Sequence, residues 1–246
     1  MAEEWRADRG SVRLEDAEVK GGYMVSIDII NIEIIQARSA KIKEKFESYS
    51  CDPRYMEEFL LALSKTCEWK YSTGPIFDEP PYQMELMGFS SGRLLKKKYK
   101  DFFEARLLGA YSSGFASDRH LVTVSPSKPQ NTPVNASRFN QENGETHIAY
   151  AYHYVDSKFN VLKPPKLNGL GEIFDLGNKT TAFIVVGRND AESIYLYCHD
   201  DHGLIRSVHL WTKGVQVQSN YDFHYDDGIL TTIKSGESLI WMSKKA

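Results

Sequence analysis

The chain has 246 residues, of which 41% are hydrophobic and 26% are charged, and its formal net charge is −3. This composition argues against a disordered chain, because it supplies enough apolar residues for a core. It also argues against a nucleic-acid-binding protein, which would carry a strong positive charge. The three cysteines, an odd number without paired spacing, disfavour a disulfide framework and favour a reducing, cytosolic compartment.

The first 22 residues form a densely charged segment that ends at Gly21-Gly22. We predict an exposed arm or short helix over residues 1–22, which either stays solvated or docks on another molecule. A single domain is expected over residues 23–246. The first residues do not resemble a signal peptide, and no run approaches the about 20 apolar residues of a membrane span. We therefore expect a cytosolic chain without a membrane partner.

Residues 23–36 are rich in Ile and Val, and they predict two strands joined by a turn near residues 28–31, or one long strand. A helical region is expected next, over residues 39–65. Asp52-Pro53 is a helix-start signal within it, and apolar residues then recur at helical spacing up to Lys65.

A basic run follows the loop signals Gly74-Pro75 and Glu79-Pro80-Pro81. Its cationic residues are Lys96, Lys97, Lys98 and Lys100. The run is either a solvated face or, because clustered ammonium groups attract polyanions, a binding site for phosphate or another acidic group. Residues 102–108 are predicted to be ordered, and the sequence is compatible with either a strand or a helix there.

From residue 120 onward, β-structure dominates. We predict strands at residues 121–124, 146–155, 180–187, 193–198, 204–211, 214–218, 229–233 and 238–242. Residues 125–145 indicate a long polar loop ending in the hairpin signal Asn143-Gly144. Lys163-Pro164-Pro165 and Gly169-Leu170-Gly171 indicate breaks between strands. Short strands separated by turns predict a mainly β fold with some helix, built as an antiparallel β-sandwich with one or two packed helices.

Three tyrosines recur at alternate positions of one predicted strand: Tyr150, Tyr152 and Tyr154. Alternate residues of a strand share one face, so His153 is expected to point the other way. The tyrosine face can stack against a sugar or a nucleotide. It can equally form core packing or a protein contact, and both interpretations stay open.

The most enzyme-like cluster is Cys198, His199 and His202. A zinc site needs about four nitrogen or sulfur ligands that converge, whereas neighbouring side chains on a β-turn diverge. We therefore expect a polar turn with no metal. No phosphate-loop or hydrolase motif stands in its required context, so we predict no catalytic residue, no enzyme and no required cofactor.

Several short segments, in the same order along the chain, resemble cypovirus polyhedrins. Arg9-Gly10 followed by Arg13-Leu14 resembles the Arg-Gly…Arg-Leu pattern of that family's N-terminal helix. The other similar segments are the helix at residues 57–65, the strand ending in Ser-Pro-Ser at residues 120–127, the hairpin and aromatic strand at residues 143–154, and the apolar strand at residues 180–187.

The resemblance implies a viral structural protein with a β-sandwich core and a protruding N-terminal helix. It implies trimers packed in a crystal lattice that embeds virus particles, with nucleoside triphosphates bound at contacts, inside occlusion bodies in the cytoplasm of infected cells. The lattice-contact candidates are Arg9, Gly10, Arg13 and Leu14, to which the charged arm adds Trp5.

Charge supports an assembly role, because a near-neutral chain associates more readily than a highly charged one. Tyrosine and lysine titrate near pH 10, so alkali would charge the chains alike and dissolve the contacts. Two other functions stay open. One is a cytosolic β-sandwich module that binds carbohydrate or nucleotide through Tyr150, Tyr152 and Tyr154. The other is a metal-dependent enzyme built around Cys198, His199 and His202.

Overall fold

The computed structural model describes residues 32–49, 54–127, 133–156, 158, 160–215 and 218–243. The arm predicted over residues 1–22 lies outside the described residues, and with it the contact candidates Trp5, Arg9, Gly10, Arg13 and Leu14. The helix-start signal Asp52-Pro53 lies outside them as well. Among the described helices, none combines the length and the apolar character that a membrane span requires.

The described chain is mainly antiparallel β-structure with a few helices, as predicted. The helices are α1 (Glu33–Tyr49), α2 (Arg54–Lys65), α3 (Gln83–Leu86) and α4 (Phe102–Leu107). The strands are β1 (Glu68–Ser72), β2 (Tyr111–Ala116), β3 (Arg119–Val124), β4 (Val134–Glu142), β5 (Glu145–Val155), β6 (Val161–Gly177), β7 (Thr180–Gly187), β8 (Glu192–His199), β9 (Ile205–Thr212), β10 (Ser219–Asp226), β11 (Ile229–Ser235) and β12 (Ser238–Met242).

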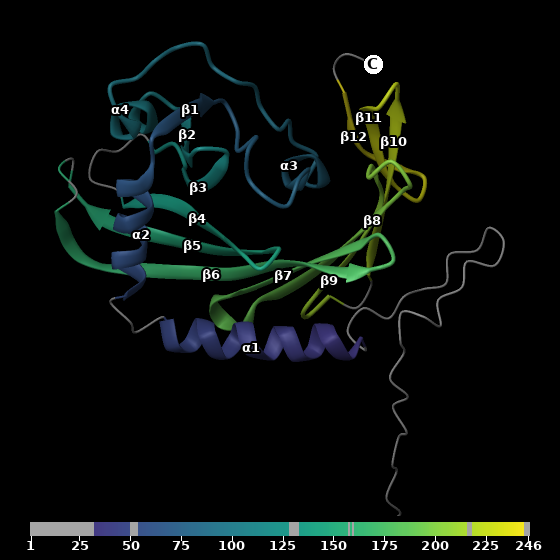
Figure 1. Ribbon diagram of the computed structural model, residues 1–246. Helices are drawn as coiled ribbons and strands as arrows, with labels where there is room; N and C mark the ends of the chain where they lie inside the picture. Colours follow the sequence, from purple (N-terminus) through teal and green to yellow (C-terminus); the bar gives the residue numbers. More distant parts are fainter. Residues whose placement is uncertain are drawn as a thin grey trace, which may run out of the picture.

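The described strands form one 12-stranded sheet in which each strand pairs with its neighbours in the sequence. The two-sheet sandwich is therefore not confirmed. The sheet is strongly curved (Figure 1): α1 lies along one face of its middle strands, while α3 and the segment around it lie over the opposite face. At one end of the sheet, β10–β12 stand at a steep angle to the middle strands.

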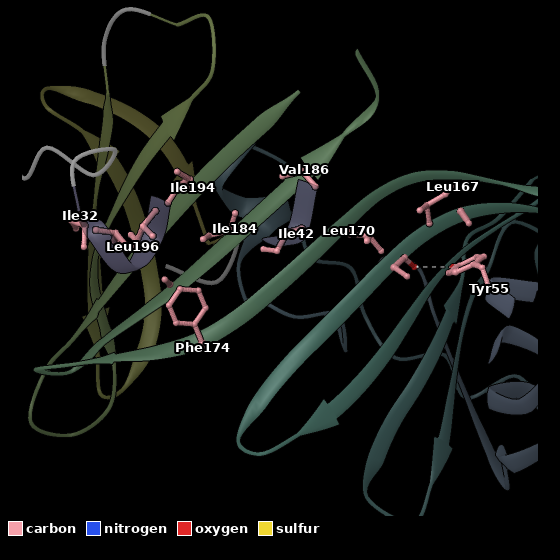
Figure 2. Close-up of a cluster of buried hydrophobic side chains, with 14 residues drawn as sticks. Ile32, Ile42, Tyr55, Leu167, Leu170, Phe174, Ile184, Val186, Ile194 and Leu196 are labelled. Carbon is pink, nitrogen blue, oxygen red and sulfur yellow. Dashed lines mark hydrogen bonds between the residues drawn. The ribbon is translucent and has the colours of Figure 1, made fainter. Parts of the chain in front are cut away.

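Helix α1 closes the first face through apolar contacts. Ile35 and Ile42 of α1 belong to a buried cluster with residues of β5–β8, among them Ile184 and Leu196. Figure 2 shows this cluster, in which Tyr55 of α2 also lies and donates a hydrogen bond to the carbonyl oxygen of Ala149 over 3.5 Å. Burial of several large aliphatic side chains, each contributing about 1.5–3 kcal/mol, holds the helix on the sheet.

Ionic contacts also fix α1 on this face. The guanidinium of Arg38 donates to Glu145 over 2.6 Å and to Glu172 over 2.5 Å. The hydroxyl of Ser39 and the ammonium of Lys43 both donate to the buried carboxylate of Glu192, the latter over 2.6 Å. Burying these carboxylates is tolerable because each has a hydrogen-bonded cationic partner.

The opposite face of the sheet carries a second buried cluster. It joins Phe139 and Ile148 of β4 and β5 to Phe223 and Ile233 of β10 and β11. Because these strands are far apart in the order of the sheet, the curvature of the sheet brings them together. A third cluster, which contains Phe59 of α2, packs this helix against β3, β4 and α4.

Several predicted elements are confirmed and others are wrong. Helix α2 and strands β5, β7 and β12 match the predicted segments. The strand predicted to run through residues 33–36 is wrong, because Glu33 begins α1 and Ile35 packs on the sheet. The predicted loop at residues 125–145 contains β4, and β10 was not predicted. The strand predicted at residues 214–218 is not seen at residues 214, 215 and 218, and residues 216–217 lie outside the described residues.

The two breaks predicted between residues 155 and 180 are also wrong, because β6 runs through both of them. Lys163-Pro164-Pro165 lies where the pairing of β5 with β6 shifts register, between Tyr152 and Tyr154. This end of β6 has no partner in β7, whose pairing begins at Gly169. Proline is tolerated at such an edge or bulge because no ladder hydrogen bond is lost there.

Candidate functional site

A pocket of about 560 Å³ opens on the face of the sheet opposite α1. One wall comes from the segment that leads into and includes α3, and the floor comes from β5, β7 and β8. The lining residues are Pro75, Ile76, Asp78, Glu79, Pro80, Pro81, Tyr82, Gln83, Met84, Glu85, Ser91, Tyr150, Phe183, Val185 and Tyr195. Its volume suits a ligand of small-molecule size.

Aromatic rings form the floor of the pocket. Phe183 of β7 and Tyr195 of β8 are directly paired in the sheet, and their rings stack with centroids 5.5 Å apart. Tyr150 of β5 lines the same pocket. Burial raises the pKa of the Tyr150 and Tyr195 hydroxyls, so both stay protonated in neutral solution and keep a hydrogen to donate.

Two glycines of β6 leave room for the rings of Phe183 and Tyr150, because they carry no side chain. A Cβ added at Gly171 would stand 2.7 Å from Cε2 of Phe183, and one at Gly169 would stand 3.6 Å from Cδ2 of Tyr150 and 2.8 Å from a backbone oxygen. The Gly169-Leu170-Gly171 sequence, predicted as a turn, is therefore a strand segment with no room for side chains beneath the aromatic floor. Glycine in a strand often marks such a close approach.

Acidic residues form the facing wall. Asp78 is partly exposed at the pocket yet surrounded by protein atoms, and this burial raises the pKa of its carboxyl to about 7. Thr123 donates a hydrogen bond to Asp78 over 2.5 Å, and Thr146 donates one to Glu79 over 3.1 Å. Glu85 is only 4% exposed and lines the pocket as well.

Asp78 is held by a hydrogen-bonded network that reaches into the sheet. The hydroxyl of Thr123 lies 2.9 Å from Nε2 of His120 and 3.1 Å from the hydroxyl of Ser113. Because Thr123 gives its single hydrogen to Asp78, it accepts from these neighbours. The carboxyl of Asp78 is therefore fixed in position, and near neutral pH it can donate or accept a hydrogen bond.

The structure separates the three predicted tyrosines. Tyr150 lines the pocket, whereas Tyr152 and Tyr154 lie further along β5, partly buried and outside the lining. The ammonium of Lys163 stands 4.0 Å from the ring centre of Tyr154. The opposite orientation of His153 is confirmed: it is 0% exposed, and its ring stacks with Phe59 of α2.

The basic run lies away from this pocket. All four lysines are exposed, and none of them lines the pocket. The ammonium of Lys97 stands 4.8 Å from the ring centre of Tyr99, and the backbone N–H of Lys100 donates to Glu104. Lys96 and Lys98 are the other members of the run. This arrangement fits a solvated face.

The predicted metal candidates do not converge. Cys198 precedes a register shift at the end of β8, and His199 lies beside Thr181 and the carbonyl oxygen of Gly203. His202 is exposed in the following turn. Within the described part of the chain, the one group with the spacing of a metal site is Glu145, His147 and Glu172.

In the group of Glu145, His147 and Glu172, an arginine side chain takes the place that a metal ion would need. Arg38 of α1 donates to both carboxylates, so a cation is already present between them. Burial raises the pKa of Glu172, but its contacts with His147 and Arg38 lower it further, and the net pKa lies below the ordinary value. The group is best explained as an ion-pair network that docks α1 on the sheet.

Sequence reasoning missed most of the pocket. Phe183 and Tyr195 were recognised only as strand residues, although their alternation with buried neighbours indicates a shared face. Asp78, Glu79 and Glu85 were not candidates, because their position depends on how an irregular segment folds over the sheet.

No known protein family, curated protein or solved structure matches this chain. The resemblance to polyhedrins therefore stays a prediction.

Proposed function

We propose that this chain is a binding module for a neutral carbohydrate, which it holds in the pocket between the segment around α3 and the sheet. The observation that carries the proposal is the pairing of an aromatic floor, made by Tyr150, Phe183 and Tyr195, with a wall that carries Asp78 and Glu79. A sugar ring offers one face of C–H groups for stacking and a rim of hydroxyls for hydrogen bonds. The two sides of this pocket match these two surfaces.

The charge of the pocket favours a sugar over a nucleotide. Among the described residues, Asp78, Glu79 and Glu85 lie in the lining, and no lysine or arginine does. A phosphate group placed there would meet carboxylates without a compensating cation, and like charges in a partly desolvated site repel strongly. The nucleotide alternative is therefore the weaker of the two ligand classes for Tyr150.

The expected affinity is modest. Each aromatic contact contributes about 0.5–1.5 kcal/mol beyond the area that it buries, and each hydrogen bond to a charged carboxylate contributes about 1.5–3 kcal/mol. After the cost of association, a ligand of one or two sugar units would bind with a Kd between about 1 mM and 1 μM.

A glycan array followed by calorimetry with the best ligand tests the proposal. Tyr150→Ala is expected to weaken binding at least tenfold. Tyr154→Ala is the matched control, because it removes the same side chain from the same strand outside the pocket, and it should leave the affinity within twofold. Absence of any glycan ligand, or equal losses in the two variants, would contradict the proposal.

A second proposal is self-assembly into intracellular protein crystals, and one observation favours it. Exposed apolar side chains gather beside β12, which is the last of the described strands in the sheet: Phe89, Ile229, Leu239 and Met242 line a shared surface hollow there. An edge strand with apolar neighbours is a template for pairing with a second copy. This second proposal includes a sandwich-like core, in which the curved sheet packs on itself. The buried cluster that contains Phe139 and Phe223 supports such packing.

Microscopy of expressing cells tests self-assembly. Micrometre crystals that dissolve at high pH are expected, and Leu239→Lys should reduce them by placing a charge on the edge of the sheet. Leu61→Lys, which adds the same charge at an exposed position of α2, is the control and should leave crystals unchanged. A wild-type chain that stays monomeric at high concentration would contradict this proposal without bearing on the carbohydrate pocket.

A further inference from the structure

A cysteine, a histidine and an asparagine lie side by side on three successive strands. Cys198 is on β8, His209 on β9 and Asn220 on β10. The pairing register places Asn220 directly opposite His209, and it places Leu196, two residues before Cys198, opposite His209 on the other side. Directly paired residues and their i+2 neighbours share a face of the sheet. The three side chains are therefore neighbours on the face that α1 covers.

The histidine is oriented by the asparagine. Nδ1 of His209 lies 2.8 Å from Oδ1 of Asn220. Because an amide oxygen only accepts hydrogen bonds, Nδ1 carries the hydrogen and donates it. The neutral imidazole then leaves Nε2 as its acceptor nitrogen, which is the atom that a neighbouring thiol can protonate.

The thiol of Cys198 completes the arrangement. Cys198 is directly paired with Ser207 of β9 and with Thr180 of β7, and His209 lies two residues beyond Ser207 on the same face. Burial raises the pKa of this thiol, but the contacts with His209 and the two hydroxyls outweigh burial and lower the pKa below its ordinary value. The neighbouring thiol of Cys198 and the amide of Asn220 raise the pKa of His209 against the effect of burial, and the charge of Asp222 on β10 adds to this rise.

The side chains of Cys198 and His209 differ in their exposure to solvent. His209 is 7% exposed and thus shielded from water, whereas Cys198 is partly exposed. Asn220 is exposed at the end of the arrangement. A shielded base beside a reachable thiol, with a third group that orients the base, is the arrangement that activates a sulfur nucleophile.

We propose that Cys198 is a nucleophilic thiol site for a soft electrophilic carbon, with His209 as its base and Asn220 as a positioning residue. The thiol proton moves to Nε2 of His209, and the sulfur forms a bond to the electrophilic carbon. The bond from that carbon to its leaving group breaks, and the leaving group departs with the electron pair. The imidazolium then gives its proton to the leaving group or to solvent.

Alkylation by iodoacetamide tests the site in the full-length chain. Cys51→Ser leaves two thiols, Cys198 and the exposed Cys67, and Cys67 serves as the internal control. Peptide mass spectrometry follows both rates between pH 5 and pH 9. At pH 6.5 we expect Cys198 to react at least tenfold faster than Cys67, with the inflection of its rate at lower pH. A Cys198 that reacts no faster than Cys67 would overturn the proposal.

Variants separate activation from simple exposure. His209→Gln should lower the Cys198 rate at least tenfold and move its inflection to higher pH, while the Cys67 rate stays the same. Asn220→Ala should lower the Cys198 rate at least threefold, and Asn220→Asp, which keeps the acceptor oxygen, should restore it. Asn220 is exposed, so its variants carry the test if His209→Gln fails to fold. A pH profile unchanged by Asn220→Ala would remove Asn220 from the site.

Discussion

The two faces of the sheet are closed in different ways. On one face, a regular helix lies along the strands and covers them with Ile35 and Ile42, while Arg38 and Lys43 pair with carboxylates of the sheet. On the other face, an irregular segment around α3 crosses over aromatic residues and leaves a pocket.

The difference shows what each kind of cover can do. A helix satisfies its own backbone and presents side chains at fixed spacing, so it can close a face completely. An irregular segment follows no such spacing, and here it leaves a pocket whose lining includes Asp78 and Glu85. The helical face thus contributes mostly to stability, and the irregular face offers groups for recognition. Four substitutions can break or sharpen this contrast.

The largest effect is expected on the helical face. Glu192→Ala removes the acceptor shared by Ser39 and Lys43, and it leaves the buried hydroxyl of Ser39 unpaired. We expect the free energy of unfolding to fall by about 3 kcal/mol. Urea denaturation measures this loss. Glu192→Gln keeps an acceptor and should cost less than half as much, so equal losses in the two variants would contradict the role of the shared acceptor.

The second-largest loss of stability is expected for a substitution beneath the pocket. Gly171→Ala would place a Cβ 2.7 Å from the ring of Phe183 and force this ring to move. Overpacking of this kind costs about 2 kcal/mol, and the displaced ring should also weaken sugar binding. Denaturation and calorimetry measure the two effects. Leu162→Ala, at an exposed position of the same strand, is the control and should stay within about 0.5 kcal/mol of the wild type.

A pH-dependent effect is expected where α2 meets the sheet. Burial lowers the pKa of His153 to about 3, against an ordinary value of 6.5. Below pH 6.5 the unfolded chain binds a proton that the folded chain does not, so stability falls as the pH falls, by about 1.4 kcal/mol per pH unit until about pH 3.

His153→Phe isolates the contribution of His153 to the pH dependence of stability. Phenylalanine keeps an aromatic ring that can stack with Phe59, but it has no group that titrates. Unfolding free energies at pH 6.5, 5.5 and 4.5 should fall less steeply in the variant than in the wild type, by about 1.4 kcal/mol per pH unit. Equal slopes would mean that His153 is protonated in the folded chain. His120, whose pKa burial lowers to about 4, contributes to both slopes alike.

The smallest effect is expected outside both faces. Lys179 pairs with Asp201 at a turn, where their side chains are 55% and 83% exposed. Water and salt screen such a pair, so Lys179→Ala should change the free energy of unfolding by less than about 0.5 kcal/mol. A larger loss in urea denaturation would mean that surface pairs, and not the two covered faces, hold the sheet together.

The predictability of each region follows from its local pattern. Strand β7 was predicted at its observed bounds because its apolar run is continuous, and α2 because Tyr55 and Phe59 recur at helical spacing. Strand β6 was missed because its prolines and glycines indicate turns when the sequence is considered locally. In the fold, the prolines lie on a part of β6 that does not pair with β7, and the glycines lie against aromatic rings. Both reasons depend on tertiary structure, which the local pattern does not show.

The candidate sites divide in the same way. Tyr150 was predicted because alternation along one strand is visible in the sequence, and the opposite orientation of His153 followed from the same rule. The carboxyl of Asp78 reaches the pocket from a segment distant in the sequence from the strands of the floor, so it requires the fold. The proximity of Cys198 and His209 depends on the pairing register of β8 and β9, which the sequence pattern does not fix. The arm at residues 1–22 stays a prediction, since it lies outside the described residues.

The most direct test of the central claim is a crystal structure of the chain with its best-binding glycan. The account predicts a sugar ring stacked on Tyr150 or Tyr195, with its hydroxyls within hydrogen-bonding distance of Asp78 or Glu79. Glycan density on another surface, with this pocket filled only by water, would contradict it.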